Sequence, residues 1–154
     1  MTPAQIMKVA SLECDNSTCL YKVGCVAAKN GEIFLQAFNE TLTGEKFCQN
    51  GKCSRKESNL SGGKSPEIVC AIHAEASLVA QAARKGIVLE GAEIFVTTFP
   101  CIICARLLCK IKIGKLFYMS DYTDSNNSKS FFDANNIPIQ QISGREVWGD
   151  LWKE

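Results

Sequence analysis

The chain has 154 residues, 46% of them hydrophobic and 21% charged, so we expect one compact domain spanning residues 1–154 with a sizeable buried core. Its formal net charge of +1 gives no strong field for attracting a long polyanion, which argues against a nucleic-acid substrate. No apolar run is long enough to cross a bilayer and the first residues lack the pattern of a secretory leader, so we expect a cytoplasmic protein without a membrane partner.

The first part of the chain predicts a helix followed by a hairpin. Apolar residues recur at helical spacing between Ile6 and Leu12, which predicts a helix over Thr2–Glu13. Two apolar, β-branched runs flank Asn30-Gly31, a dipeptide that supplies the positive φ angles of a two-residue turn. We therefore expect a hairpin over Lys22–Phe38.

Residues 39–69 are rich in Thr, Gly, Ser, Lys and Asn and read as a long loop. Such a loop inside a compact domain is unusual unless it is functional or fixed in place. Cys48 and Cys53 are separated by four residues that include Gly51, a spacing typical of a zinc knuckle. The sequence therefore predicts a second, structural Zn²⁺ that orders this loop, held by Cys19, Cys48, Cys53 and Cys70.

The alternative is that these cysteines are unpaired thiols of the loop and the core. Nine cysteines is an odd number, and in a reducing compartment cysteines serve as metal ligands or core thiols more often than as disulfides. We assign Cys14, Cys25 and Cys109 to this class of unpaired loop and core thiols.

The middle of the chain predicts two helices around a strand. An Ala-rich segment, Cys70–Lys85, ends at Gly86, a typical helix C-cap, and contains His73 and Glu75 in its first turn or so. A strand is expected over Ala92–Thr98, and Pro100 opens a second helix that runs to about Ile111.

The last third alternates again between strands and other elements. We expect a strand over Lys115–Met119, a polar loop over Asp121–Ser130, a short helix over Phe131–Asn135 and a strand over Ile137–Ile142. In the tail, residues 143–154, two tryptophans and a leucine lie at helical spacing and could dock on the body or on a neighbouring molecule. Strands that alternate with helices indicate an α/β sandwich.

Two short motifs carry the chemistry: His73-Ala74-Glu75, and Cys101 and Cys104 in Pro-Cys-Ile-Ile-Cys. One His and two Cys suit a tetrahedral Zn²⁺ that keeps its fourth position for water. Glu75 is too close in sequence to bind the same ion comfortably, but it is well placed to move a proton. This combination of His-x-Glu and Pro-Cys-x-x-Cys is similar to the signature of zinc-dependent base deaminases.

Each motif alone has a plainer interpretation. A lone Cys-x-x-Cys is more often a structural zinc knuckle or a redox pair, and a lone His on an apolar helix is more often a core residue. The His-x-Glu, the Pro before the first Cys and the order of the two motifs together favour catalysis.

The stretch from Cys19 to about Ile142 resembles the cytidine deaminase superfamily, and specifically the deoxycytidylate (dCMP) deaminases. The matching pieces are Cys19–Gly24, Phe38-Asn39, the cysteines Cys48, Cys53 and Cys70, His73–Glu75, Thr98–Ala105 and Tyr122. This resemblance implies a three-layer α/β/α sandwich with a mixed sheet of about five strands. It also implies an oligomer, with a hexamer as a common form.

The resemblance implies the following roles. His73, Cys101 and Cys104 bind the catalytic zinc, and Glu75 carries the proton. Asn39 hydrogen-bonds the substrate sugar, the main chain near Ala74 reads the pyrimidine, and Tyr122 stacks near the substrate. For Asn39 a plainer role as a turn residue stays open.

The expected reaction is hydrolysis of the exocyclic C–N bond of a cytosine nucleotide, most simply dCMP to dUMP with release of ammonia. The chain departs from the family at Glu40, where Gly is common, and at Ser77 and Leu78, where Asn and Ala are common. A carboxylate beside a phosphate repels it unless the carboxylate points away or is paired. Two alternatives stay open: deamination of a free nucleoside, a free base or a base in RNA or DNA, and a catalytically silent zinc module for assembly.

Overall fold

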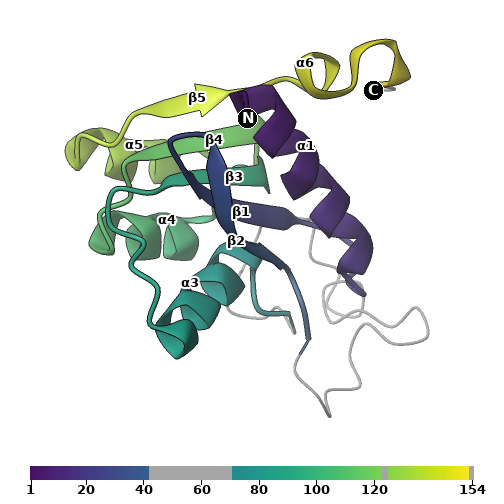
Figure 1. The fold of residues 1–154 in the computed structure, drawn as a ribbon. Helices are drawn as coiled ribbons and strands as arrows, with labels where there is room; N and C mark the ends of the chain where they lie inside the picture. The colour runs from purple at the N-terminus through teal and green to yellow at the C-terminus, as the bar shows by residue number, and fades with distance from the viewer. Residues whose placement is uncertain (42–70, 123–124, 153–154) are drawn as a thin grey trace, which may run out of the picture.

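The structure, a computed structural model, describes residues 1–41, 71–122 and 125–152 (Figure 1). In chain order its elements are α1 (Pro3–Glu13), the 3-10 helix η1 (Cys14–Asn16), β1 (Gly24–Lys29), β2 (Glu32–Phe38), α3 (Ala74–Lys85), β3 (Glu93–Thr98), α4 (Ile102–Lys110), β4 (Lys115–Ser120), α5 (Ser125–Ala134), β5 (Ile139–Gln141), α6 (Gly144–Trp148) and the 3-10 helix η3 (Gly149–Leu151).

The strands form one mixed sheet of five strands in the order β2-β1-β3-β4-β5. β1 pairs antiparallel with β2 and with β3, whereas β4 pairs parallel with β3 and with β5. The predicted hairpin is confirmed, because Asn30 (φ 52°) and Gly31 (φ 78°) form the left-handed turn between β1 and β2. The expected mixed sheet of about five strands is also confirmed.

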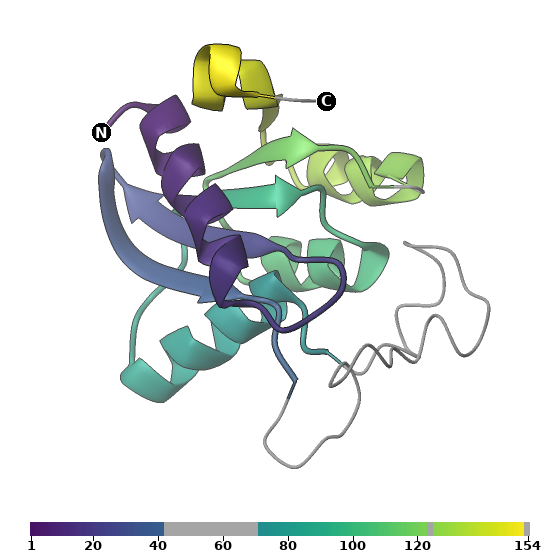
Figure 2. The ribbon, with the colours of Figure 1, turned by 90° about the vertical axis from the view of Figure 1, so that its right-hand side faces the viewer.

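Helices cover both faces of the sheet, which makes the expected three layers (Figures 1 and 2). On one face α1 and α6 pack against Val26, Ala28 and Phe95 of the central strands. On the other face α3, α4 and α5 pack against strand residues of the alternate set, such as Cys25 of β1 and Ile94 of β3. Successive residues of a strand point to opposite faces, and both faces are covered, so the middle residues of β1, β3 and β4 are apolar and buried on both sides.

α1 is fixed at its start by a cap and at its end by a close crossing over the sheet. The Thr2 side chain accepts from the Gln5 N–H while the Gln5 side chain accepts from the Thr2 N–H, which is a complete capping box. Near the helix end Gly24 lies so close that a Cβ there would stand 1.9 Å from the carbonyl oxygen of Ala10. A glycine at the start of β1 is therefore required for α1 to lie on the sheet.

Both helices of the middle region begin later than predicted. α3 starts at Ala74 and not at Cys70, because Ile72 is held extended by a β-bridge to Glu40, so His73 is the N-cap and lies before the first turn. α4 starts at Ile102, with Cys101 extended at its N-cap (ψ 167°), so Pro100 precedes the helix. The predicted C-cap is confirmed at Gly86 (φ 66°).

The prediction of a polar loop over Asp121–Ser130 was wrong, because α5 begins at Ser125 and runs to Ala134. Its Ser and Asn residues are poor helix formers, but burial of Ser128 and Phe132 decides the conformation. The Phe132 ring makes an edge contact with Phe99 at 5.8 Å between centroids, which anchors α5 to the loop before α4. β5 is shorter than predicted, at Ile139–Gln141.

The tail docks on the body of the same chain, one of the two outcomes that the sequence left open. Trp148 and Trp152 pack against the apolar cluster under α1, and the Lys8 ammonium lies 4.7 Å from the centre of the Trp148 ring. Leu151 is 79% exposed and takes no part. Within the described part of the chain no helix is long and apolar enough to span a membrane.

Candidate metal centre

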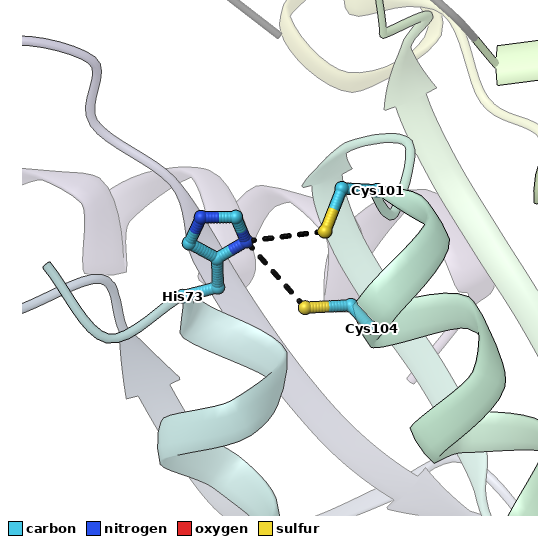
Figure 3. A group of neighbouring side chains, drawn as sticks. All are labelled: His73, Cys101 and Cys104. Carbon is cyan, nitrogen blue, oxygen red and sulfur yellow. Dashed lines mark hydrogen bonds between the residues drawn. The ribbon is translucent and has the colours of Figure 1, made fainter. Parts of the chain in front are cut away.

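The beginnings of α3 and α4 bring His73, Cys101 and Cys104 together (Figure 3). His73 and Cys101 are the N-cap residues of the two helices, and neither side chain makes a capping hydrogen bond. Ser, Thr, Asp and Asn are the residues that normally cap a helix. The N-cap side chains are thus directed at each other instead of at their own helices.

The spacing of the three ligand atoms fits a zinc ion. His73 Nδ1 lies 3.4 Å from Cys101 Sγ and 3.5 Å from Cys104 Sγ, and all three atoms lie within 4.8 Å of one another. A tetrahedral centre with ordinary zinc bond lengths separates nitrogen from sulfur by about 3.5 Å and two sulfurs by about 3.8 Å. Among the described residues this is the one group of three or more potential ligands that meets at a point.

The electrostatics of the cluster favour thiolate. Hydrogen bonding from the Cys104 thiol, helped by the His73 ring, lowers the pKa of Cys101 to about 4. The pKa of Cys104 is raised in turn, because its proton is the one shared with Cys101 and because the thiol is buried. Two helix N-termini also direct their positive ends at this point. A divalent cation that takes the place of the shared proton would meet two sulfur ligands ready to bind it.

Glu75 lies in the first turn of α3 and is 3% exposed. Burial raises the pKa of its carboxyl group, and the neighbouring His73 ring acts in the opposite direction. The carboxyl group is also within hydrogen-bonding reach of the Cys104 thiol. Cys25 of β1 is fully buried, and this burial, together with the charge of Glu75, raises the pKa of the Cys25 thiol well above its usual value.

Asn39 follows β2 and holds a neighbouring segment of chain. Its Oδ1 accepts from the Ser17 hydroxyl and from the Val23 N–H, both at 2.8 Å, and its Nδ2 donates to the Tyr21 carbonyl at 2.7 Å. These contacts agree with the plainer structural role that the sequence left open for Asn39. They do not test its expected role with a substrate sugar, which stays a prediction.

The other two expected substrate contacts lie on the same side of the sheet. Ala74 is the first residue of α3 and is fully buried, so its main chain belongs to the helix N-terminus next to the cluster. Tyr122 is half-buried and packs against the apolar core under α3, α4 and α5. Their roles toward substrate stay predictions.

The predicted second zinc falls largely outside the described residues, because Cys48, Cys53 and Cys70 are not among them. Cys19 is described: it is 6% exposed and its Sγ lies 3.8 Å from the Asn39 carbonyl oxygen. The three cysteines assigned to the unpaired thiols form no disulfide among the described residues; Cys25 and Cys109 are buried and Cys14 is half-buried.

The sequence did not predict that Glu40 and Ser77, two of the three departures from the family pattern, contact each other. The Ser77 hydroxyl donates to Glu40 Oε1 at 2.7 Å, so the two departures form a pair. It also missed Lys129, whose ammonium lies 5.3 Å from the centre of the Phe99 ring and is ion-paired with Asp121 at 2.8 Å. No local pattern reveals such contacts, because Glu40 and Ser77 are 37 positions apart.

Comparison with known proteins agrees with this geometry. The chain is 28% identical to the deoxycytidylate deaminase of Schizosaccharomyces pombe over 136 residues, which cover 88% of this chain but 42% of that protein. It is 28% identical to the deoxycytidylate deaminase of Enterobacteria phage T4, with 79% of each chain covered. This chain thus spans less than half of the yeast protein but most of the phage one.

Solved structures share the fold. The dCMP deaminase of the cyanophage S-TIM5, in complex with dCMP and dUMP, matches with a TM-score of 0.75 at 24% identity, over 92% of this chain and 99% of that one. The sequence model described as "Cytidine and deoxycytidylate deaminase zinc-binding region" matches residues 2–120, which include all three residues of the cluster and Glu75. The chain therefore belongs to the cytidine and deoxycytidylate deaminase family.

Proposed function

We propose that this protein is a zinc-dependent hydrolytic deaminase that converts a cytosine nucleotide to the uracil nucleotide, with dCMP as substrate and dUMP and ammonia as products. The observation that carries the proposal is the meeting of His73 Nδ1 and two cysteine sulfurs at zinc spacing beside a buried glutamate. The names of the yeast and phage relatives support the choice of dCMP.

His73, Cys101 and Cys104 would hold the catalytic Zn²⁺. When bound, the ion supplies a Lewis acid that makes water a good nucleophile at neutral pH. Water then adds to C4 of the pyrimidine, the C4–N bond breaks and ammonia leaves.

Glu75 moves the protons in this reaction. Its carboxylate takes one proton from water as the C4–O bond forms and gives it to the ring nitrogen N3; it then takes a second proton from the added hydroxyl group and gives it to the departing amino group, which leaves as ammonia. The carboxyl group holds the proton between uptake and delivery in each of the two transfers.

The remaining site residues would orient the nucleotide. The amides at the start of α3, around Ala74, have no partner within the helix and can read the edge of the base. The amide group of Asn39 carries two N–H bonds, so besides its bond to the Tyr21 carbonyl it can donate to a sugar oxygen. Tyr122 offers a ring near the base, and its partial burial limits how far that ring can move.

A deamination panel tests the proposal. Cytosine, cytidine, deoxycytidine, CMP, dCMP, dCTP, guanine and adenine compounds and a cytosine-containing oligonucleotide are each incubated with wild-type protein and with Glu75→Gln, and ammonia is measured. We expect the wild-type protein to release ammonia from dCMP and Glu75→Gln to release none that can be measured. Turnover of the oligonucleotide or of a free base without turnover of dCMP would contradict the substrate, and no Glu75-dependent ammonia from any compound would contradict the enzyme.

We also propose the second, structural zinc at Cys19, Cys48, Cys53 and Cys70. The support is the sequence spacing together with the buried position of Cys19. Metal analysis should find two zinc ions per chain in wild type and one in Cys48→Ser, which should also become sensitive to protease within residues 39–66. One zinc in never-chelated wild-type protein would contradict this proposal.

We further propose a cytoplasmic homo-oligomer built from single-domain chains. The support is the family resemblance, the thiolate ligand set, which a reducing compartment preserves, and exposed apolar residues such as Val88 and Ile103. Sedimentation should show more than one chain per particle at micromolar concentration, and a hexamer is the form to look for first. A monomer would contradict the oligomer and leave the deaminase proposal standing.

A further inference from the structure

Glu40 joins the end of β2 to the chain on both sides of His73. Its N–H donates to the Ile72 carbonyl at 3.1 Å, and its own carbonyl accepts from the Ile72 N–H at 2.8 Å. This two-bond bridge is isolated, because β2 itself ends at Phe38. It fixes the residue immediately before the metal ligand to the sheet.

The Glu40 side chain holds the residue on the far side of the ligand. The Ser77 hydroxyl donates to Glu40 Oε1 at 2.7 Å, and Ser77 is 3% exposed. A hydrogen bond to a carboxylate is about twice as strong as one between neutral groups, and burial strengthens it further. The Ser77 N–H in turn donates to the His73 carbonyl at 2.9 Å, which is the first hydrogen bond of α3.

His73 needs such support from outside its own helix. It occupies an N-cap position without making a capping hydrogen bond, so its side chain does not fix the start of α3. Glu75 lies one turn or less from both contact points, between Ile72 and Ser77 in sequence. The orientation of the start of α3 relative to the end of β2 therefore sets the positions of both His73 and Glu75.

We propose that Glu40 is a positioning residue that acts through Ile72 and Ser77 to hold His73 and Glu75 at the geometry of the metal centre. This inference rests on the metal site of the proposed function. It also explains how a carboxylate is accommodated at position 40: the charge is directed at the Ser77 hydroxyl of α3.

The test compares Glu40→Ala, Ser77→Ala, the double variant and the conservative Glu40→Gln with wild type. The first readout is the Zn²⁺ dissociation constant, from competition with a chelating dye. The second is the visible absorption spectrum of the Co²⁺-loaded protein, which reports the geometry of the ligands. The third is the melting temperature of the metal-free protein.

We expect Glu40→Ala and Ser77→Ala each to weaken Zn²⁺ binding by about tenfold and to shift the Co²⁺ spectrum, as loss of an outer-shell support does in other metal sites. The double variant should lose no more than the larger single loss, because both changes break the same bond. Glu40→Gln keeps an acceptor oxygen and should stay within about threefold of wild type.

The matched control is Ser143→Ala, which removes a comparable serine hydrogen bond, the cap of α6, on the opposite face of the sheet. It should lower the melting temperature and leave metal affinity and the Co²⁺ spectrum unchanged. If the Glu40 and Ser77 variants behave like Ser143→Ala, Glu40 is merely structural and the inference is overturned. If wild type itself binds neither Zn²⁺ nor Co²⁺, the proposed metal site fails, and that result is distinct because no variant is needed to see it.

Discussion

α1 and α6 begin with complete capping boxes, at Thr2 and at Ser143, whereas α3 and α4 begin with His73 and Cys101 and have no side-chain cap. The first pair lies on one face of the sheet and the second pair on the other. Substituting a good N-cap residue by alanine costs about 1 kcal/mol, so the two uncapped helices give up stability of that order at each start.

The difference separates the helix starts that serve stability, on one face of the sheet, from those that serve the metal centre, on the other. At the starts of α1 and α6, which have no chemical task, the sequence supplies residues that satisfy the N–H groups well. Where two helix starts face each other, those positions carry a histidine and a cysteine, and the N–H groups and the dipole are left directed at a shared point. Four predictions test this division, from the largest expected effect to the smallest.

Cys104→Ala should remove the catalytic metal and with it all measurable turnover, because two ligands are too few for a stable site. The matched control is Cys109→Ala on the same helix, whose buried thiol contacts the Phe131 carbonyl and not the cluster. It should keep the metal. Zinc analysis of both proteins decides the matter, and equal metal content in the two would contradict the assigned ligand.

Glu75→Gln should keep the metal and the fold while turnover falls by about 10²–10⁴, the range typical of a general acid–base group. The amide matches the carboxylate in shape but cannot accept and return a proton. Ammonia release and zinc content are measured on the same sample. Retention of more than a tenth of wild-type turnover would rule out a proton-transfer role for Glu75.

Thr2→Ala should lower the free energy of unfolding by about 1 kcal/mol and leave turnover unchanged, because it breaks the capping box of α1 on the face away from the cluster. Urea denaturation gives the stability and the dCMP assay gives the activity. Loss of activity with retained folding would mean that the two faces are not independent.

Cys101→Ser should give a gain in stability, whereas the other three variants give a loss of metal, activity or stability. Serine is a good N-cap, so the metal-free variant should be more stable than metal-free wild type by about 0.5 kcal/mol, although its metal site is impaired. Cys109→Ser, a buried position inside the same helix, should instead be destabilised. Denaturation in the presence of a chelator measures the stability of both metal-free variants. If Cys101→Ser is less stable than metal-free wild type, the idea that position 101 gives up helix capping for metal binding is contradicted.

The features that the sequence predicted well are those encoded locally. Asn30-Gly31 specifies its turn through backbone conformation alone, and Gly86 ends α3 for the same reason. The residue types and spacing of His73, Cys101 and Cys104 indicated one metal centre, and the fold brings them together.

The features that it did not predict depend on contacts between distant segments. The start of α3 is set by the bridge from Ile72 to Glu40, and α5 begins at Ser125, in a turn whose Ser128 is buried against the body. The contact between Glu40 and Ser77 follows from how β2 lies against α3, which no pattern within either segment reports.

The docked tail has an optical consequence. The chain contains two tryptophans, and both lie in this segment, packed against the apolar cluster of α1 on the face of the sheet opposite the metal cluster. Intrinsic tryptophan emission therefore reports the seating of the tail on α1 and Lys8, with no tryptophan near the cluster to respond directly to zinc. A change in emission on metal loading would mean that the event at α3 and α4 is transmitted through the full thickness of the sheet.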